Sequence, residues 1–277
     1  MIIGVANQGG RIHDSWLPSL LEALDAGLDL VSGMHVRLTQ TPVLVAAAER
    51  LHRRLIDVRV PPRDLPIASG RKRTGKRMLT VGTDCALGKK YTALAIARVL
   101  RNRGIDADFR ATGQTGIMIA GGGMPMDAVV SDFEAGAAEM LSPDAAPDHW
   151  DVIEGQGSLF HPAYAAVSLG LLHGSQPDVI IVCHEPGRTH MLGHAHYALP
   201  SIEETIDLNL RLARRTNPAA RCGGVSLNTS KLAPSEAQRL LEVEGARLRL
   251  PVADPIRGGA SFEALVDNCL NGPVPKI

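Results

Sequence analysis

Aromatic residues and net charge are both scarce in this sequence of 277 residues. Phe, Trp and Tyr make up 3% of it, and 29 lysines and arginines balance 29 aspartates and glutamates. A core with so few aromatic rings must be aliphatic, which suits parallel sheets covered by helices. A nucleic-acid binder or a binder of anionic membranes carries a clear basic excess. We therefore expect no nucleic-acid or membrane partner, and expect a small-molecule substrate instead.

Paired cysteines and long apolar runs are also missing. No two of the four cysteines form a CxxC pair, so neither a disulfide framework nor a zinc module is indicated, and we predict no metal site. No apolar run reaches the ~18 to 20 residues of a membrane span. The start, MIIGVANQGG, lacks the basic and long apolar stretches of a signal peptide. These features predict a reduced, cytoplasmic protein.

Short apolar runs alternate with helical patterns along the first 66 residues. The runs predict strands at residues 2–6, 28–32 and 55–60, with helices between them. Residues 1–66 are therefore expected to form a small Rossmann-like α/β unit. Its first turn, Asn7–Gly10, lacks the G-x-G-x-x-G pattern of a dinucleotide site. We expect this unit to serve as an interaction or sheet-extending domain.

A proline-rich stretch, residues 61–66, separates this unit from the rest of the chain. Residues 67–277 again alternate strands and helices, which predicts a parallel, doubly wound α/β sheet. In such sheets ligands bind at the carboxyl ends of the strands. The strands are expected at 78–81, 107–111, 151–154, 179–184, 223–227 and 251–253, and the helices near 89–103, 127–141, 201–215 and 234–247.

The strongest local motif lies between the first of these strands and the first helix. A loop bounded by Gly82 and Gly88 leads into Lys89, the pattern of a phosphate-binding loop. The loop is one residue longer than the common G-x-x-x-x-G-K-[ST] motif. Lys90 stands where a Ser or Thr normally ligates Mg²⁺. Thr92 lies too far along the helix to replace that hydroxyl simply.

Two further motifs point to a P-loop fold. The loop resembles that of dethiobiotin synthetase and its amidoligase relatives. Residues 151–157 (DVIEGQG) resemble their second acidic motif, in which Glu154 would face the phosphates. Residues 224–230 (GVSLNTS) resemble the strand end at which an asparagine, here Asn228, borders the base. The order of the three motifs predicts a P-loop NTPase-like sheet.

Longer motifs give a closer resemblance. The segments FRATGQTGIMIA (109–120), DHWDVIEGQGSLFHP (148–162), LGLLHGSQPD (169–178), CHEP (183–186) and LNLRLARRTN (208–217) are similar to a bacterial and archaeal family that includes D-glutamate N-acetyltransferase. The resemblance implies transfer of an acetyl group from acetyl-CoA to the amine of an acidic amino acid, such as D-glutamate. Family members begin with an additional βα segment, so we expect an incomplete N-terminal unit. We also expect a homo-oligomer.

The predicted cofactor fits the loop, because coenzyme A carries a diphosphate and a 3′-phosphate. Two adjacent lysines would neutralise these phosphates without a metal ion. The basic run 71–77 would either contact the 3′-phosphate or form a solvated linker. The residues predicted to bind the cofactor are Gly82, Thr83, Asp84, Gly88, Lys89, Lys90, Thr92 and Asn228.

Acetyl transfer also needs a proton acceptor and a site for the substrate carboxylates. Glu154 is the first candidate for the base, with His161 and the pair His184–Glu185 as alternatives. The residues predicted to bind substrate are Arg110, Gln114, Thr115 and Arg188. The glycines of segment 120–123 form either a lid or a plain loop. Histidines in 184–196 have metal-like spacing, but the surrounding Pro and Gly indicate a loop.

Two other functions stay open at this point. One is a ligase or kinase that uses ATP and Mg²⁺, like dethiobiotin synthetase. The other is a nucleotide-binding regulator without turnover. Lys90 argues against the first, because it removes the hydroxyl that a P-loop uses to hold Mg²⁺.

Overall fold

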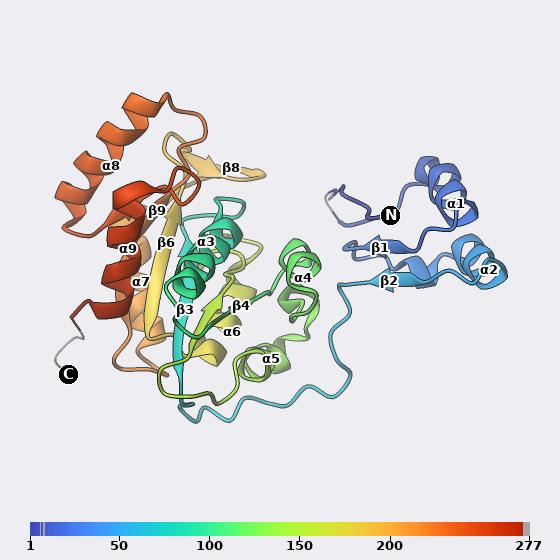
Figure 1. Ribbon diagram of the computed structural model, residues 1–277, viewed down its shortest axis with the longest axis horizontal. Helices are drawn as coiled ribbons and strands as arrows, with labels where there is room; N and C mark the ends of the chain where they lie inside the picture. The colour runs from blue at the N-terminus through green and yellow to red at the C-terminus, as the bar shows by residue number, and fades with distance from the viewer. Residues whose placement is uncertain (6, 8, 274–277) are drawn as a thin grey trace.

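A six-stranded parallel sheet forms the larger part of the protein (Figure 1). The computed structural model describes residues 1–5, 7 and 9–273. The strand order is β10-β9-β6-β3-β5-β4, and every neighbouring pair is parallel, which confirms the predicted doubly wound sheet. The strands are β3 (Lys76–Gly82), β4 (Ala107–Arg110), β5 (Trp150–Ile153), β6 (Val179–His184), β9 (Arg221–Leu227) and β10 (Val252–Ala253).

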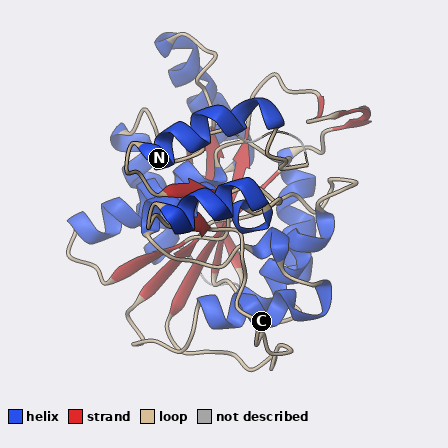
Figure 2. Cartoon of the chain, turned by 90° about the vertical axis from the view of Figure 1, so that its right-hand side faces the viewer, coloured by secondary structure: helices blue, strands red, loops and turns tan. Residues whose placement is uncertain are grey.

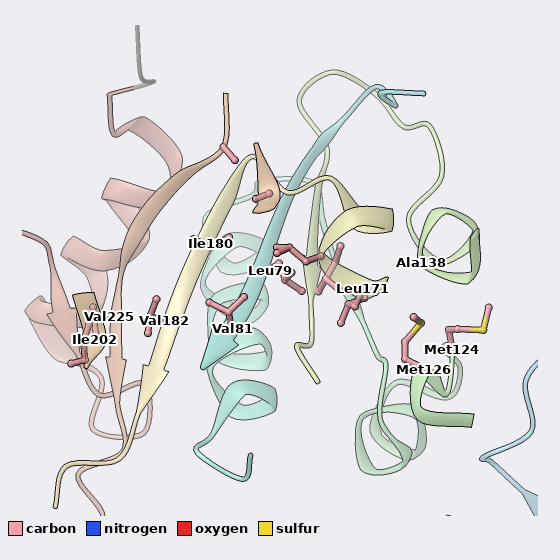
Figure 3. Close-up of a cluster of buried hydrophobic side chains, with 14 of the residues drawn as sticks. Leu79, Val81, Met124, Met126, Ala138, Leu171, Ile180, Val182, Ile202 and Val225 are labelled. Atoms are coloured by element: carbon pink, nitrogen blue, oxygen red, sulfur yellow. The ribbon is translucent and has the colours of Figure 1, made fainter. Parts of the chain in front are cut away.

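Alternating side chains along β3 divide the core into two layers, as the pleat of a strand requires. Met78 packs with the helices on one face, α3 (Lys89–Asn102) and α9 (Gly259–Asn271). Leu79 and Val81 pack on the other face, in the cluster drawn in Figure 3. That face is covered by α5 (Glu134–Leu141), α6 (Ala165–Ser175), α7 (Ile202–Ala213) and α8 (Pro234–Leu248). Figure 2 shows helices on both faces of the sheet.

The order of connections places the loop after β3 at a reversal point of the sheet. The chain runs from β3 to β4, returns to β5, and then crosses to β6 on the other side of β3. The carboxyl end of β3 therefore lies between those of β5 and β6. In doubly wound sheets this reversal point is where ligands bind.

The N-terminal unit is a separate, smaller layer. Its strands β1 (Leu30–Ser32) and β2 (Leu55–Asp57) are parallel, and Ile2 adds a single parallel bridge to Val31. Helices α1 (Leu17–Asp25) and α2 (Pro42–Arg50), with 3₁₀ turns at Asp14–Trp16 and Leu38–Gln40, complete it. The predicted strand 2–6 is thus reduced to a bridge, while Ala6, its last residue, and Gln8 of the predicted turn lie outside the described residues. This sheet does not join the six-stranded one, so the sheet-extending role predicted for the unit is wrong.

The linker between the two units is packed against helix α5. A Cβ atom on Gly136 would stand 1.8 Å from the carbonyl oxygen of Pro66, so the chain passes directly over this glycine. The amides of Ser69 and Gly70 donate to the carboxylate of Glu139, at 2.9 and 3.0 Å. These contacts fix the path by which the N-terminal unit reaches the rest of the protein.

Several elements were not predicted. Helix α4 (Gln114–Ala120) follows β4, and α6 and α9 also had no counterpart in the sequence analysis. The predicted helix 127–141 consists of two 3₁₀ turns, Met126–Ala128 and Ser131–Phe133, followed by α5. The histidine-rich segment forms an antiparallel hairpin of β7 (His190–Met191) and β8 (His194–Ala198). Among the described residues, none of the helices combines the length and apolar character that a membrane crossing needs.

Candidate phosphate loop and cleft

The loop after β3 presents a row of backbone amides that donate to none of the residues the structure describes. Gly88 adopts a φ of 107°, a left-handed conformation that suits glycine, and helix α3 starts at the next residue. In the described part of the chain, the amides of residues 86–91 donate no hydrogen bond. Three of these amides belong to the first turn of the helix, where the backbone dipoles attract negative charge. The geometry is that of an anion site.

Lys89 brings a positive charge into the curve of this loop. Its ammonium group donates to the carbonyl oxygen of Asp84 at 2.7 Å, and the residue is only 6% exposed. Burial lowers the pKa of Lys89. Gly155 permits this position: a Cβ atom there would stand 3.2 Å from the Lys89 Cδ atom and 1.6 Å from the carbonyl oxygen of Thr80. A phosphate entering the loop would offer the buried ammonium a stronger partner than a carbonyl.

Asp84 and Arg188 stabilise the loop through hydrogen bonds to each other and to its backbone. The buried carboxylate of Asp84 accepts from the amides of Cys85 (2.6 Å) and Leu192 (2.8 Å) and from Nη1 of Arg188 (2.9 Å). Arg188 also donates to the carbonyl oxygen of Cys85 at 2.8 Å. Arg188, predicted to bind substrate, is therefore engaged with the loop and is not among the residues that line the cleft in front of it.

Two threonines of the predicted cradle support the loop from inside the protein. The hydroxyl of Thr92 lies 3.1 Å from the carbonyl oxygen of Gly88 and 2.8 Å from the Ser226 hydroxyl. Thr83 is fully buried, and its hydroxyl lies 3.0 Å from Nδ1 of His184. Both side chains fix the loop, and the Thr92 hydroxyl is already committed to protein partners.

A cleft of about 720 Å³ opens in front of the loop. Lys90 lines it from α3, Gln114 and Thr115 line it from the start of α4, and Glu154 lines it from the end of β5. The structure thus brings these four predicted residues together with Gly88 and Lys89. The N-terminal unit contributes Asn7, Gly9, Gly10, His35 and Arg59.

Glu154 is held with one carboxylate oxygen bonded and the other free. Oε2 accepts from the amides of Thr112 (3.0 Å) and Gly113 (3.1 Å), while no hydrogen bond joins Oε1 to the described residues. The residue is 5% exposed, and burial raises the pKa of Glu154, although the two amides oppose the shift. A buried carboxylate with a raised pKa at the wall of a cleft is suited to accept a proton.

The other candidate bases lie outside the cleft. His184 faces a separate cavity of about 320 Å³, and burial lowers its pKa. Although burial opposes ionisation of Glu185, hydrogen bonds from Lys231 (2.5 Å) and Arg188 lower the pKa of Glu185. His161 is fully buried behind the loop, with Nε2 3.8 Å from Asp84 Oδ1. Only Glu154 among the candidates lies in the cleft wall.

Arg110, the first candidate for binding a substrate carboxylate, turns away from the cleft. Its guanidinium donates to Asp151 at 2.6 Å and pairs with Asp108 at 3.1 Å. Asp151 is buried and lies nearer the amino end of the sheet, two residues before the end of β5. The structure therefore gives Arg110 an ion-pair role and does not bring it to the predicted site.

The basic run 71–77 is also far from the phosphate loop, because it precedes β3 and the loop follows it. Arg77 is fully buried and donates to the carbonyl oxygens of Thr74 (3.0 Å) and Pro143 (2.9 Å). Arg73 donates to the carbonyl oxygens of Ser142 and Gly174, at 2.7 and 2.6 Å. The position of this run argues against contact with a 3′-phosphate held at the loop. The alternative of a solvated linker fits Arg71, Lys72, Thr74 and Lys76, which are exposed, but not Arg73 and Arg77, which are buried.

Asn228 lines a smaller cavity of about 270 Å³ on the other side of the loop. Tyr91, Pro255 and Ile256 give this cavity its apolar walls, and Leu87 and Gly88 line both it and the large cleft. The phosphate loop thus lies between a small cavity with apolar walls and the large cleft.

Sequence reasoning missed Arg59 and His35. Arg59 follows β2, and its Nη1 lies 2.5 Å from His35 Nε2 and 3.3 Å from Asp127 Oδ2. The contact with Asp127 joins the N-terminal unit to the larger domain. The predicted strand 55–60 includes Arg59, whereas β2 ends at Asp57, so the position of Arg59 beyond a strand end was not visible in the sequence.

The fold and cleft define a P-loop protein with an N-terminal Rossmann-like unit, and comparisons with known proteins agree. Residues 66–266 match the family described as "Domain of unknown function (DUF1611_C) P-loop domain", and residues 1–61 match its "DUF1611_N Rossmann-like domain". The chain belongs to this family.

Curated relatives give the family an activity. A protein of Tritonibacter scottomollicae is 54% identical over 94% of this chain and 78% of its own length, and one of a Pseudoalteromonas species is 48% identical over 93% and 78%. Both are named D-glutamate N-acetyltransferase. A crystal structure of a family protein from Anabaena variabilis is 37% identical, covers 97% of this chain and 79% of that one, and has a TM-score of 0.89.

Proposed function

We propose that this protein transfers an acetyl group from acetyl-CoA to the amine of D-glutamate, and that its phosphate loop binds the phosphates of coenzyme A. The observation that carries the proposal is the set of amides at residues 86–91, which donate to none of the described residues, beside the buried ammonium of Lys89. The names of the two curated relatives supply the reaction and the acceptor.

The arrangement of spaces around the loop fits the order of groups in acetyl-CoA. The small cavity beside Tyr91 and Asn228 would take the adenine, whose flat apolar faces suit its walls. The loop would bind the diphosphate. The pantetheine arm would then extend into the large cleft, where Glu154 lies.

The donor set around the loop favours an acyl carrier over a nucleotide held with Mg²⁺. Lys90 stands at the position of the usual Mg²⁺-binding hydroxyl, and the Thr92 hydroxyl is bonded to Gly88 and Ser226. Lys90 lines the cleft next to Lys89, so two ammonium groups are available to neutralise a diphosphate. Acyl transfer from a thioester splits no phosphoanhydride, and it needs no such metal ligand.

Glu154 would act as the base in this reaction. Its free Oε1 would accept a proton from the ammonium of the acceptor, which makes the amine nucleophilic. The amine then forms a bond to the thioester carbonyl carbon and the carbon–sulfur bond breaks. The second proton lost by the nitrogen protonates the sulfur, so the coenzyme leaves as a thiol. The two amides bonded to Oε2 keep the carboxylate in place while Oε1 takes the proton.

Release of thiol from acetyl-CoA, followed with a chromogenic disulfide, tests the proposal. We expect release with D-glutamate and much slower release with L-glutamate. We expect Lys89→Met to weaken coenzyme A binding in calorimetry by about 30-fold, because a charge-assisted hydrogen bond to phosphate is lost. Lys76→Met, at the opposite end of β3, is the matched control and should bind normally.

Two results would contradict the proposal. One is formation of ADP from Mg-ATP without thiol release, which would identify the ligase or kinase. The other is tight coenzyme A binding with no turnover on any D- or L-amino acid, which would identify a regulator.

Two expectations from the sequence stay predictions. The four thiols are free, which agrees with a reducing cytoplasm. The homo-oligomer is to be tested by light scattering on the purified protein.

A further inference from the structure

Arg59 is the one guanidinium group in the wall of the cleft, within the part of the chain that the structure describes. It follows β2 in the N-terminal unit, and its side chain is 10% exposed. Nη1 is engaged twice: it lies 2.5 Å from His35 Nε2 and 3.3 Å from Asp127 Oδ2. These partners come from both units and fix the plane of the guanidinium.

The opposite edge of the same guanidinium, formed by Nε and Nη2, is not bonded by any residue in the described ranges. Nε is buried and makes no hydrogen bond to any described residue, and none of the described residues bonds Nη2. A buried, unpaired donor on a charged group is costly, so its partner is expected to come from outside the chain. The Nε–Nη2 edge presents two parallel N–H groups, the arrangement that binds a carboxylate with two hydrogen bonds.

The surroundings leave Arg59 as a positive charge facing the cleft. Burial, followed by the charge of Arg59, lowers the pKa of His35, which favours the neutral imidazole. Because a guanidinium can only donate, Nε2 of His35 is the acceptor of the hydrogen bond from Nη1. Asp127 contacts only the Nη1 side. Lys89 is turned into the phosphate loop, where it donates to Asp84. A carboxylate in the cleft would therefore find Arg59 oriented by His35 and Asp127, with no described residue bonded to its Nε–Nη2 edge.

We propose that the Nε–Nη2 edge of Arg59 binds a carboxylate of the amino acid acceptor. The proposal rests on the acetyl transfer proposed above and adds the residue that recognises the acceptor. The phosphate loop holds the donor, and the N-terminal unit binds the acid group of the acceptor across the same cleft. Specificity for acidic amino acids then belongs to the smaller unit, and Asp127 acts as a positioning residue for Arg59.

Steady-state kinetics with both substrates tests the assignment. Arg59→Met should raise the KM for D-glutamate by about 30-fold or more, because two charge-assisted hydrogen bonds are lost. Arg59→Lys should recover part of this loss, since an ammonium keeps the charge but not the fork. The KM for acetyl-CoA should change less than twofold in both variants. Arg54→Met is the matched control: Arg54 precedes β2, is exposed, and pairs with Asp29.

A KM for D-glutamate within twofold of the wild-type value in folded Arg59→Met would overturn the proposal. So would an equal rise in both KM values, which would place Arg59 with the donor. Calorimetric titration with D-glutamate alone separates this proposal from the reaction itself. If the wild-type protein releases no thiol, the proposed function is wrong. The titration still shows whether Arg59 binds the carboxylate of D-glutamate. Binding that is lost in Arg59→Met supports the assignment; binding that persists, or no binding to the wild-type protein, overturns it.

Discussion

The carboxylate of Glu154 lies directly against Gly116 of helix α4, where a Cβ atom would stand 2.1 Å from Oε2. This contact explains why a glycine occupies the middle of a seven-residue helix, a position that costs about 1 kcal/mol relative to alanine. The helix approaches β5 closely enough for the amides before it, those of Thr112 and Gly113, to reach Oε2. Gly116 thus sets the orientation of the proposed base.

Gly116→Ala should therefore disable the base without touching the phosphate loop. The methyl group would push the carboxylate off the two amides. We expect kcat to fall about 10-fold or more, which is part of the roughly 10²- to 10⁴-fold that a general base contributes. Affinity for coenzyme A should stay unchanged in calorimetry. Gly122→Ala is the control, because no atom lies within 4 Å of its added Cβ. An unchanged kcat in Gly116→Ala would mean that Glu154 is not the base of the reaction.

Glu154→Gln should lower the activity and raise the stability of the protein at pH 8. Because burial raises the pKa of Glu154 in the folded protein above its unfolded value, the folded state binds the proton more tightly. The stability contributed by this proton is present below the unfolded pKa and is lost as the pH rises through the folded pKa. At pH 8 the wild type must keep an ionised carboxylate buried, which costs stability, whereas glutamine is uncharged at every pH. The variant should therefore melt at a higher temperature than the wild type at pH 8 and at the same temperature near pH 4.

Activity gives the second half of this test. The kcat of the wild type should fall as the pH drops through the raised pKa, whereas Glu154→Gln should show a uniformly low kcat. Melting curves and initial rates between pH 4 and 8 measure both effects. A variant that is less stable than the wild type at pH 8 would mean that the hydrogen bonds of Thr112 and Gly113 to the carboxylate outweigh its desolvation.

The arginines before β3 should affect stability and not coenzyme binding. Arg77→Met removes a fully buried guanidinium together with its hydrogen bonds, including those to the carbonyl oxygens of Thr74 and Pro143, and should cost about 3 kcal/mol or more in unfolding free energy. Arg71 is exposed and pairs with Asp144, so Arg71→Ala should change little. Denaturant unfolding measures the first effect. Weaker coenzyme A binding by Arg71→Ala would mean that the basic run contacts the 3′-phosphate of coenzyme A after all, against the position that the structure gives it.

Much of the larger domain could be predicted because its signals are local. The strand, Gly82, Gly88 and Lys89 lie within fourteen residues, 76–89, and the doubly wound order follows from the alternation of elements. Helix α4 was missed because Gly113 and Gly116 are typical of a turn. A Cβ atom on Gly116 would collide with Glu154, and one on Gly113 would collide with Gln156; both are contacts between segments far apart in the chain.

The arginines could not be ranked from sequence for the same reason. Arg110 stands at the end of an apolar strand, where a ligand residue is expected, yet the buried carboxylate of Asp151 draws its guanidinium away from the cleft. Arg59 had no motif, and it reaches the cleft only because the linker carries the N-terminal unit to it. Whether Arg110 or Arg59 reaches the cleft depends on the direction of the side chain and on long-range packing. Neither can be derived from the spacing of residues in the sequence.

The contact between Gly136 and the linker leads to a test of how the two units are held together. Gly136→Ala would place a methyl group 1.8 Å from the carbonyl oxygen of Pro66, and both groups belong to backbone segments that cannot simply rotate away. The linker must move off α5, which should break the hydrogen bonds from Ser69 and Gly70 to Glu139. We expect a loss of about 1 to 3 kcal/mol in unfolding free energy, as for overpacking of a core.

The position of Arg59 depends on this linker, so the same substitution should also raise the KM for D-glutamate while leaving coenzyme A affinity unchanged. Limited trypsin digestion should cleave the variant faster than the wild type at Arg63 or Arg71. Gly245→Ala, in helix α8, is the control: its nearest atom lies 3.6 Å away, and the protein should gain up to about 1 kcal/mol from helix propensity. If Gly136→Ala digests like the wild type and keeps its KM, the packed linker does not hold the N-terminal unit over the cleft.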